Sequence, residues 1–190
     1  LNNLSEEYVK KFSFNLLKCK FLLDNYVVHH SNDEDVITNN PWQLQTWHKD
    51  NHIYKKNLSA DDTRLQDRLV HLLSMFEVSF TARQRKNYLF YWLLYLIDLK
   101  KPDLEAYCKF LEALADKYFK DIYLVQNRLN NINTPKPDSF DAVIILKDQE
   151  PATNSFAEIY GDGKEASRGV PLFVFNYLDY KLWKKYDEEL

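Results

Sequence analysis

Residues 161–169, GDGKEASRG, hold all three glycines of this chain and include a Gly-Lys pair, a combination that can cradle a phosphate. A phosphate loop of the Walker type has two glycines five positions apart, followed by Lys and then by Ser or Thr. Here no glycine stands five positions before Gly163, and Glu165 follows Lys164. The dinucleotide pattern G-x-G-x-x-G fails as well, because Ala166 replaces its third glycine. The sequence therefore predicts a surface turn here and no nucleotide cofactor.

Two histidine pairs have the chemistry of metal ligands. His48 and His52 lie four positions apart, a spacing at which two imidazoles on one helix can share a metal. Their segment has no helical stripe of apolar residues and no evident third ligand, so we expect surface histidines. His29 and His30 precede the acidic stretch 33–35, which suggests a metal nuclease, but adjacent side chains on a strand point to opposite faces. We therefore expect no metal site.

Nucleophilic residues give no catalytic pattern. The chain has no G-x-S-x-G elbow, the turn that presents the serine of many Ser-His-Asp hydrolases. Its two cysteines, Cys19 and Cys108, fall on apolar faces of different helical patterns and lack an activating neighbour. We expect both to be buried free thiols in a reducing cytoplasm. The sequence thus nominates no catalytic residue and no cofactor.

Basic residues give the strongest signal for a binding site. They gather at the start of an aromatic helical segment, just after its end, and one turn apart on the helix before it: Arg83, Arg85, Lys86, Lys100, Lys101, Arg64 and Arg68. Together they could line one face and contact DNA phosphates. The alternative is that they solubilise helix ends, where cations at the C-terminal end favour the helix dipole. Because the cations within 83–86 oppose that dipole, they favour a DNA or acidic-protein partner.

Apolar periodicity predicts five helices that would position these side chains. They are expected from a Ser5 N-cap to about residue 24, over 60–77 behind a capping box of Ser59 and Asp62, over 81–98, from 103 to about 122, and over 172–188. The third is apolar on every face, so we expect it at the centre of the fold. Short strands are expected at 26–30 and 141–146, and the polar segment 31–57 is expected to be an irregular loop.

Composition and patterning together predict a mainly α fold, a helical bundle-like domain with one or two short β segments. The 190 residues fit a single domain, 1–190, with a weak seam near 126–140. A net charge of −3 does not indicate a general affinity for nucleic acid. The longest apolar run, 88–97, is about half the length that spans a membrane. We expect no membrane partner. Because the chain begins with Leu1 and ends in a helical pattern, we expect a piece of a longer protein.

Three segments resemble a known family: LLDNYVVHH (22–30), TARQRKNYLFYWLLYLI (81–97) and LFVFNYLDYKLWK (172–184). In this order they look like the middle region of GmrSD-type proteins, the modification-dependent, type IV restriction endonucleases of bacteria. That family has an N-terminal ParB/sulfiredoxin-like nucleotide-hydrolysing domain, a mostly helical middle region and a C-terminal His-Asn-His nuclease domain. This chain lacks the Asp-Gly-Gln-Gln-Arg and His-x-x-Pro motifs of those two domains. The resemblance therefore implies a helical connector and transfers no catalytic residue.

Three functions follow as hypotheses. The resemblance implies a non-catalytic connector of a restriction-like DNA-processing protein, which positions flanking domains of the same polypeptide and contacts DNA. The alternative is a helical protein–protein interaction module unrelated to nucleic acid, which contiguous exposed aromatic residues would favour. The third is an enzyme, which a deep pocket containing His48, His52 and acidic residues would favour.

Overall fold

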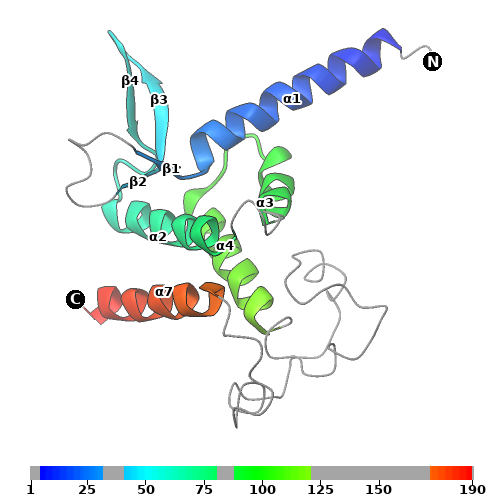
Figure 1. The fold of residues 1–190 in the computed structure, drawn as a ribbon. Coiled ribbons are helices and arrows are strands. Elements are labelled where there is room, and N and C mark those ends of the chain that lie inside the picture. The colour runs from blue at the N-terminus through cyan, green and yellow to red at the C-terminus, as the bar shows by residue number, and fades with distance from the viewer. Residues whose placement is uncertain (1–4, 32–40, 81–87, 121–171, 190) are drawn as a thin grey trace, which may run out of the picture.

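The architecture is mainly helical, with two small sheets. The computed structural model describes residues 5–31, 41–80, 88–120 and 172–189. Its helices are α1 (Glu6–Tyr26), α2 (Thr63–Ser79), α3 (Tyr88–Ile97), α4 (Leu104–Tyr118) and α7 (Leu172–Glu189), and its strands are β1 (His29–His30), β2 (Trp42–Gln43), β3 (Gln45–Lys49) and β4 (Ile53–Asn57). β1 pairs with β2 and β3 with β4, both antiparallel (Figure 1). The prediction of a mainly α fold with short β segments is confirmed.

Side chains at the N-termini of two helices explain where these helices begin. The Ser5 hydroxyl accepts a hydrogen bond from the Tyr8 backbone N–H at 3.2 Å, so the predicted N-cap of α1 is confirmed. At α2 the cap is Asp62, whose carboxylate accepts from the Leu65 N–H at 3.0 Å. The predicted capping box is therefore wrong in its cap residue, because Ser59 lies buried in the turn before the helix.

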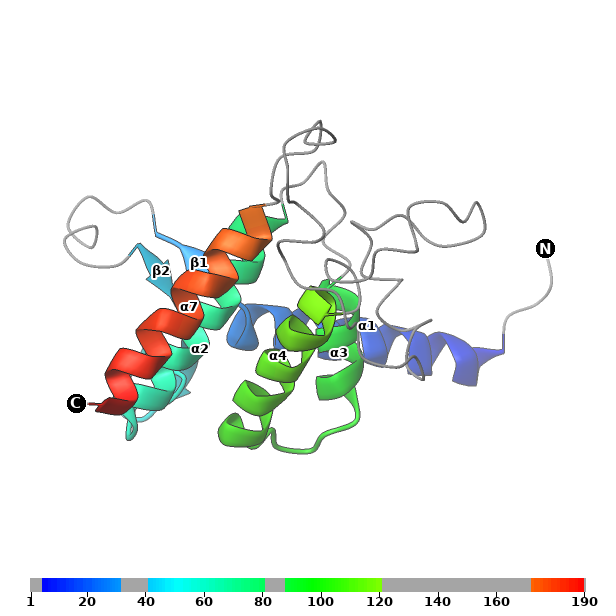
Figure 2. The same cartoon turned by 90° about the horizontal axis from the view of Figure 1, so that it is seen from below.

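Helix α2 is the central element of the described core. Its side chains Leu69, Leu72 and Phe76 retain no exposure to solvent. Both α7 and α4 pack against α2, and α7 runs alongside it for most of its length (Figures 1 and 2). Aromatic rings fill the junction at the end of α2, where Phe76 stacks on Tyr88 with ring centroids 5.2 Å apart. The burial of apolar side chains between these helices supplies the main stabilisation of the fold.

Helix α3 is covered less completely than its sequence suggested. Trp92 and Leu96 are fully buried, but Phe90 and Leu94 are 58% and 50% exposed. The prediction of a central helix covered on every face is therefore wrong, because α1 and α4 contact α3 on the side that carries the buried stripe. An all-apolar composition shows only that any side of a helix can be buried. The positions of the neighbouring helices determine which sides are buried. The expected start of this helix, 81–87, lies outside the described residues.

Part of the segment expected to be irregular forms a β-hairpin. β3 pairs with β4 in a register that runs from Gln45 opposite Asn57 to Lys49 opposite Ile53. The irregular-loop prediction is wrong for this part. Successive side chains point to opposite faces of the hairpin, and each face carries both aromatic and basic residues, so the strands looked like a polar loop in the sequence. The strand expected over 26–30 is shortened to β1, which pairs only with β2.

Helix α1 has two unlike halves. All side chains of residues 5–17 are exposed, whereas Leu22 and Asn25 near its C-terminal end are buried. Cys19 lies between these regions and is half-buried, whereas Cys108 on α4 is fully buried; both thiols are free. The prediction of buried free thiols is confirmed for Cys108 and wrong for Cys19, because the body of the fold contacts only the later turns of α1.

Several expectations fall on other parts of the chain. The seam near 126–140, the strand at 141–146 and the turn at 161–169 lie outside the described residues. Within the described ranges, no helix combines the length and the apolar character needed to cross a membrane.

Candidate nucleic-acid interface

Arg68, one of the predicted DNA-contacting residues, is partly buried and ion-paired to another helix. Its guanidinium lies 3.2 Å from the Glu112 carboxylate and 3.6 Å from that of Glu105, both on α4. Glu112 also accepts hydrogen bonds from Lys184, at 2.8 Å, and from Tyr180. Burial acts to raise the pKa of Glu112, but the hydrogen bonds from Lys184, Tyr180 and Arg68 outweigh it and lower that pKa. This cluster ties α2, α4 and α7 together and neutralises the charge of Arg68.

The remaining predicted cations are divided between two described places and a segment outside the described residues. Arg64 is exposed on α2 and donates a hydrogen bond to the Asp187 carbonyl oxygen at 3.3 Å. Lys100 and Lys101 are exposed in the connection between α3 and α4. Three further residues lie outside the described residues: Arg83, Arg85 and Lys86. The described structure therefore leaves Arg64, Lys100 and Lys101 exposed and places Arg68 in an ion-paired cluster, where its side chain is 21% exposed.

A stronger basic and aromatic surface lies on the β3–β4 hairpin. Trp47 is 61% exposed, and directly across the ladder from it stands Lys55. The Lys55 ammonium lies 5.2 Å from the Trp47 ring centroid, a cation–π contact. On the same face of the hairpin, Lys49 stands opposite the exposed Ile53. This face combines an open aromatic ring with two ammonium groups.

The other face of the hairpin fastens it to the rest of the molecule. Thr46 donates its hydroxyl to the Asn25 side-chain oxygen at 2.5 Å, which joins β3 to the end of α1. Further out, His48 meets Tyr54 edge-on with ring centroids 5.5 Å apart. Because alternate residues of a strand point to opposite sides, these contacts lie on the face opposite Trp47, whose ring stays 61% exposed.

Gln66 on α2 closes the base of the hairpin. Its side-chain amide donates to the Leu44 carbonyl oxygen at 2.8 Å and accepts from the Ser59 backbone N–H at 2.9 Å. Leu44, the residue just before β3, is buried and also accepts a hydrogen bond from the Leu58 N–H at 3.1 Å. The chain entering β3 and the chain leaving β4 are thus fixed to one buried side chain. The exposed strands therefore project from an ordered base.

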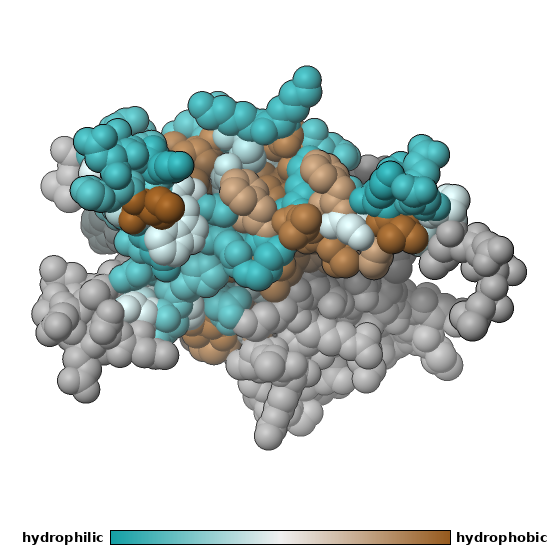
Figure 3. Space-filling model, turned by 90° about the horizontal axis from the view of Figure 1, so that it is seen from above, coloured by the Kyte–Doolittle hydropathy of each residue, from teal (hydrophilic) through white to brown (hydrophobic). Residues whose placement is uncertain are grey.

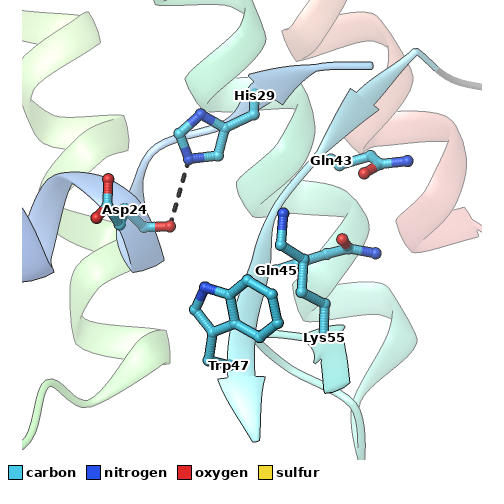
Figure 4. A pocket seen from close by; sticks show the side chains of 6 residues that line it. All are labelled: Asp24, His29, Gln43, Gln45, Trp47 and Lys55. Atoms are coloured by element: carbon cyan, nitrogen blue, oxygen red, sulfur yellow. Dashed lines mark hydrogen bonds between the residues drawn. The ribbon is translucent and has the colours of Figure 1, made fainter. Parts of the chain in front are cut away.

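A hollow of about 220 Å³ lies where the hairpin meets α1 and β1 (Figure 4). Its lining combines an indole, an ammonium, two amides, an imidazole and a carboxylate: Trp47, Lys55, Gln43, Gln45, His29 and Asp24. The His29 ring donates to the Asp24 carbonyl oxygen at 3.3 Å on one wall, and Trp47 and Lys55 form the opposite wall. An aromatic ring beside side-chain amides provides stacking and edge hydrogen bonding, which together suit a planar heterocycle.

The histidines considered as metal ligands lie apart. His48 and His52 belong to the hairpin and its turn, and neither lines the hollow. His30 meets Trp42 edge-on at 5.1 Å between ring centroids, whereas His29 turns towards Asp24. Among the residues that the structure describes, no three His, Cys, Asp or Glu side chains come together as a metal site would need. The acidic stretch 33–35 is outside those residues.

The sequence did contain a signal for this interface. Residues 45–57, QTWHKDNHIYKKN, carry three lysines, two aromatic residues and two histidines, with only one acidic residue among them. Alternation within two short runs around a polar turn is the pattern of a hairpin, and basic residues interleaved with aromatic ones are typical of nucleic-acid contacts. Polar composition and the preceding proline directed the prediction to a loop instead.

Comparison with known proteins finds no matching family model, no matching curated protein and no matching solved structure. The resemblance to GmrSD-type restriction proteins stays a prediction.

Proposed function

We propose that this chain binds nucleic acid through the β3–β4 hairpin. The observation that supports the proposal is the exposed Trp47 ring flanked by Lys49 and Lys55 on a single face. Aromatic side chains that project from a basic surface stack on bases, while the ammonium groups hold the phosphates. This contact uses residues other than those the sequence favoured.

The composition of the hollow favours an unpaired base over duplex DNA. Stacking on Trp47 requires a base whose face is open, as in a single strand or an extruded nucleotide. The amides of Gln43 and Gln45 could then donate to and accept from the edge of that base. Lys55, next to the ring, would pair with its phosphate.

Within a larger protein we propose a non-catalytic role, as the GmrSD resemblance implies. The helical body would act as a connector of a bacterial restriction-like DNA-processing protein, and it would hold flanking catalytic domains in position. The hairpin would give this connector a DNA-binding contact of its own. Its ordered base at Gln66 supports such a role, because a contact that positions other domains must itself be fixed.

A binding titration tests the nucleic-acid proposal. A labelled single-stranded oligonucleotide and its duplex are titrated with the 190-residue chain and followed by fluorescence anisotropy. Trp47→Ala should raise the Kd for the single strand roughly 5- to 150-fold, since base stacking on an aromatic residue is worth about 1–3 kcal/mol. Tyr186→Ala removes an equally exposed aromatic side chain on α7 and should leave the Kd unchanged.

Salt dependence separates phosphate contacts from stacking. Lys55→Ala should reduce the slope of log Kd against log salt by about 0.7 if its ammonium meets one phosphate of a single strand. Lys109→Ala, an exposed lysine on α4, serves as the matched control and should leave the slope unchanged. A Lys100→Ala and Lys101→Ala double variant tests the residues that the sequence favoured. Absence of binding at low salt, or equal binding by the Trp47→Ala variant, would refute the proposed interface.

A protein–protein interaction module is the second candidate, and the exposed apolar half of α1 favours it. That surface is separate from the Trp47 face of the hairpin, so the two candidates predict different sensitive variants. Substitutions in the hairpin affect only the first, whereas substitutions in residues 5–17 affect only the second.

A further inference from the structure

The face of the hairpin that carries Trp47 continues beyond the hollow towards the turn. Two cross-strand pairs follow one another along it, Trp47 with Lys55 and then Lys49 with Ile53. Residues two positions apart on a strand share a face, so these side chains form one surface, which we call the hairpin track. Ile53 is 67% exposed and lies outside the lining of the hollow. In Figure 3 an apolar patch surrounded by hydrophilic side chains lies at the left of the view, where the hairpin projects.

The hydrogen bonds of the hairpin bring the two side chains of each pair close together. The Leu58 N–H donates to the Leu44 carbonyl oxygen at 3.1 Å, and the Asp50 N–H donates to the His52 carbonyl oxygen at 3.1 Å. Hydrogen-bonded and non-hydrogen-bonded pairs alternate along an antiparallel ladder, so both pairs of the track are non-hydrogen-bonded. Side chains are closest at such positions, as the cation–π contact of the first pair shows.

Each pair of the hairpin track combines one apolar side chain with one ammonium group. The first pair offers the Trp47 indole beside Lys55. The second pair offers the exposed side chain of Ile53 beside the exposed Lys49. A nucleotide brings one base, which packs on an aromatic or apolar surface, and one phosphate, which binds a cation. The two pairs are therefore two successive positions of the same chemical kind.

The distance between the two pairs fits one step of an extended nucleic-acid strand. The pairs are two residues apart on each β-strand, which corresponds to about 6.8 Å along the hairpin. A nucleotide contributes twice as many backbone bonds as an amino-acid residue, so an extended strand advances by about the length of two β-strand residues per nucleotide. A strand that lies along the hairpin would therefore bring one nucleotide to each pair.

We propose that the hairpin track holds an extended single strand, which runs from the hollow towards the turn and places successive nucleotides on the two pairs. The inference rests on the nucleic-acid binding proposed above, and it selects a single strand over an extruded nucleotide. Trp47 stacks on the first base, and Ile53 supports the second. The neighbours of an extruded nucleotide stay paired in the duplex, so none of them would present an open base to Ile53.

A length series of labelled deoxythymidine strands, from a mononucleotide to about eight nucleotides, tests the track by fluorescence anisotropy with the 190-residue chain. Ile53→Trp adds a second ring and should lower the Kd of strands of two or more nucleotides roughly fivefold. The Kd of the mononucleotide should change less, because only a longer strand can contact both rings at once. Leu94→Trp, at a half-exposed position on α3, is the matched control and should leave every Kd unchanged. Both positions are exposed, so the thermal midpoint of each variant should match the parent's and show that it folds.

Lys49→Ala tests the second phosphate position, and it should reduce the slope of log Kd against log salt by about 0.7 for the longer strands. If Ile53→Trp and Lys49→Ala both bind long strands as the parent does while Trp47→Ala weakens binding, the track is overturned and the proposed function stands. Tighter binding of a duplex with one mismatched base pair than of the single strand would also overturn the track. If the parent chain binds no strand of any length at low salt, the track and the proposed function fail together.

Discussion

Replacing Gln66 by Leu should release the hairpin from the body of the protein. Gln66 is 5% exposed, and its amide bonds two backbone groups, the Leu44 carbonyl at 2.8 Å and the Ser59 N–H at 2.9 Å. These groups lie on either side of the β3–β4 hairpin. Leu has a similar volume and keeps most of the packing, but it can replace neither hydrogen bond.

The two lost bonds differ in their cost. The Leu44 carbonyl keeps the hydrogen bond from the Leu58 N–H at 3.1 Å, so it stays satisfied. The Ser59 N–H belongs to a buried residue and loses its acceptor. An orphaned buried donor costs about 1–3 kcal/mol, and this should be the fall in the free energy of unfolding. The thermal midpoint should fall by roughly 2–4 °C for each kcal/mol in a chain of this size.

Urea denaturation and hydrogen exchange measure the effect. Gln66→Leu should lower the denaturation midpoint and speed the exchange of amides in β3 and β4 more than of those in α2. Gln45→Leu makes the same chemical change on the open face of the hairpin, where it should alter stability by less than about 0.5 kcal/mol. Equal stability and unchanged exchange for Gln66→Leu would refute the idea that Gln66 anchors the hairpin.

Gln66→Glu refines the test. An ionised carboxylate can still accept from the Ser59 N–H, but it is repelled by the Leu44 carbonyl oxygen and its position is buried. This variant should be less stable than Gln66→Leu at neutral pH. It should regain stability on acidification relative to Gln66→Leu, because a protonated carboxyl can donate to Leu44. The two variants showing the same pH dependence would contradict this account.

Three further predictions follow from burial. Trp92→Ala should lower the free energy of unfolding by about 3–5 kcal/mol, because the ring is fully buried, and an unchanged thermal midpoint would contradict this. Burial lowers the pKa of His71, whose ring stacks on Trp183 with ring centroids 4.2 Å apart. The contribution of His71 to the free energy of unfolding should therefore be complete above about pH 6.5 and fall as the pH drops below it. Urea titrations of the His71→Phe variant should show a smaller fall. Burial raises the pKa of Cys108 to about 11, so iodoacetamide should alkylate the half-buried Cys19 first, as mass spectrometry would show.

Helices were predictable where apolar spacing was regular. The helix expected over 60–77 is α2, Thr63–Ser79, and the one expected over 172–188 is α7, Leu172–Glu189. Both carry buried residues at helical spacing, so one face is marked in the sequence itself. The burial of each helix was harder to predict. The stripes of α1 and α3 show that a face is apolar, but only the neighbouring helices determine whether it is covered.

The candidate site was predictable in type but not in place. A count of basic residues cannot show that Arg68 is paired with Glu112, because the two are 44 positions apart and meet only in the packed fold. The hairpin was missed because its strands are short and polar, and its base is closed by Gln66, which belongs to α2. Long-range contacts of this kind override local propensity.

Two proposed surfaces meet at one rigid junction. Thr46 on β3 bonds Asn25 at 2.5 Å, and the buried Tyr107 hydroxyl donates to the Tyr26 carbonyl at 3.0 Å, so the end of α1 is fixed to both the hairpin and α4. From this junction the hairpin and α1 diverge (Figure 1). A partner that packs on the exposed half of α1 would therefore be held at a fixed position relative to the hairpin.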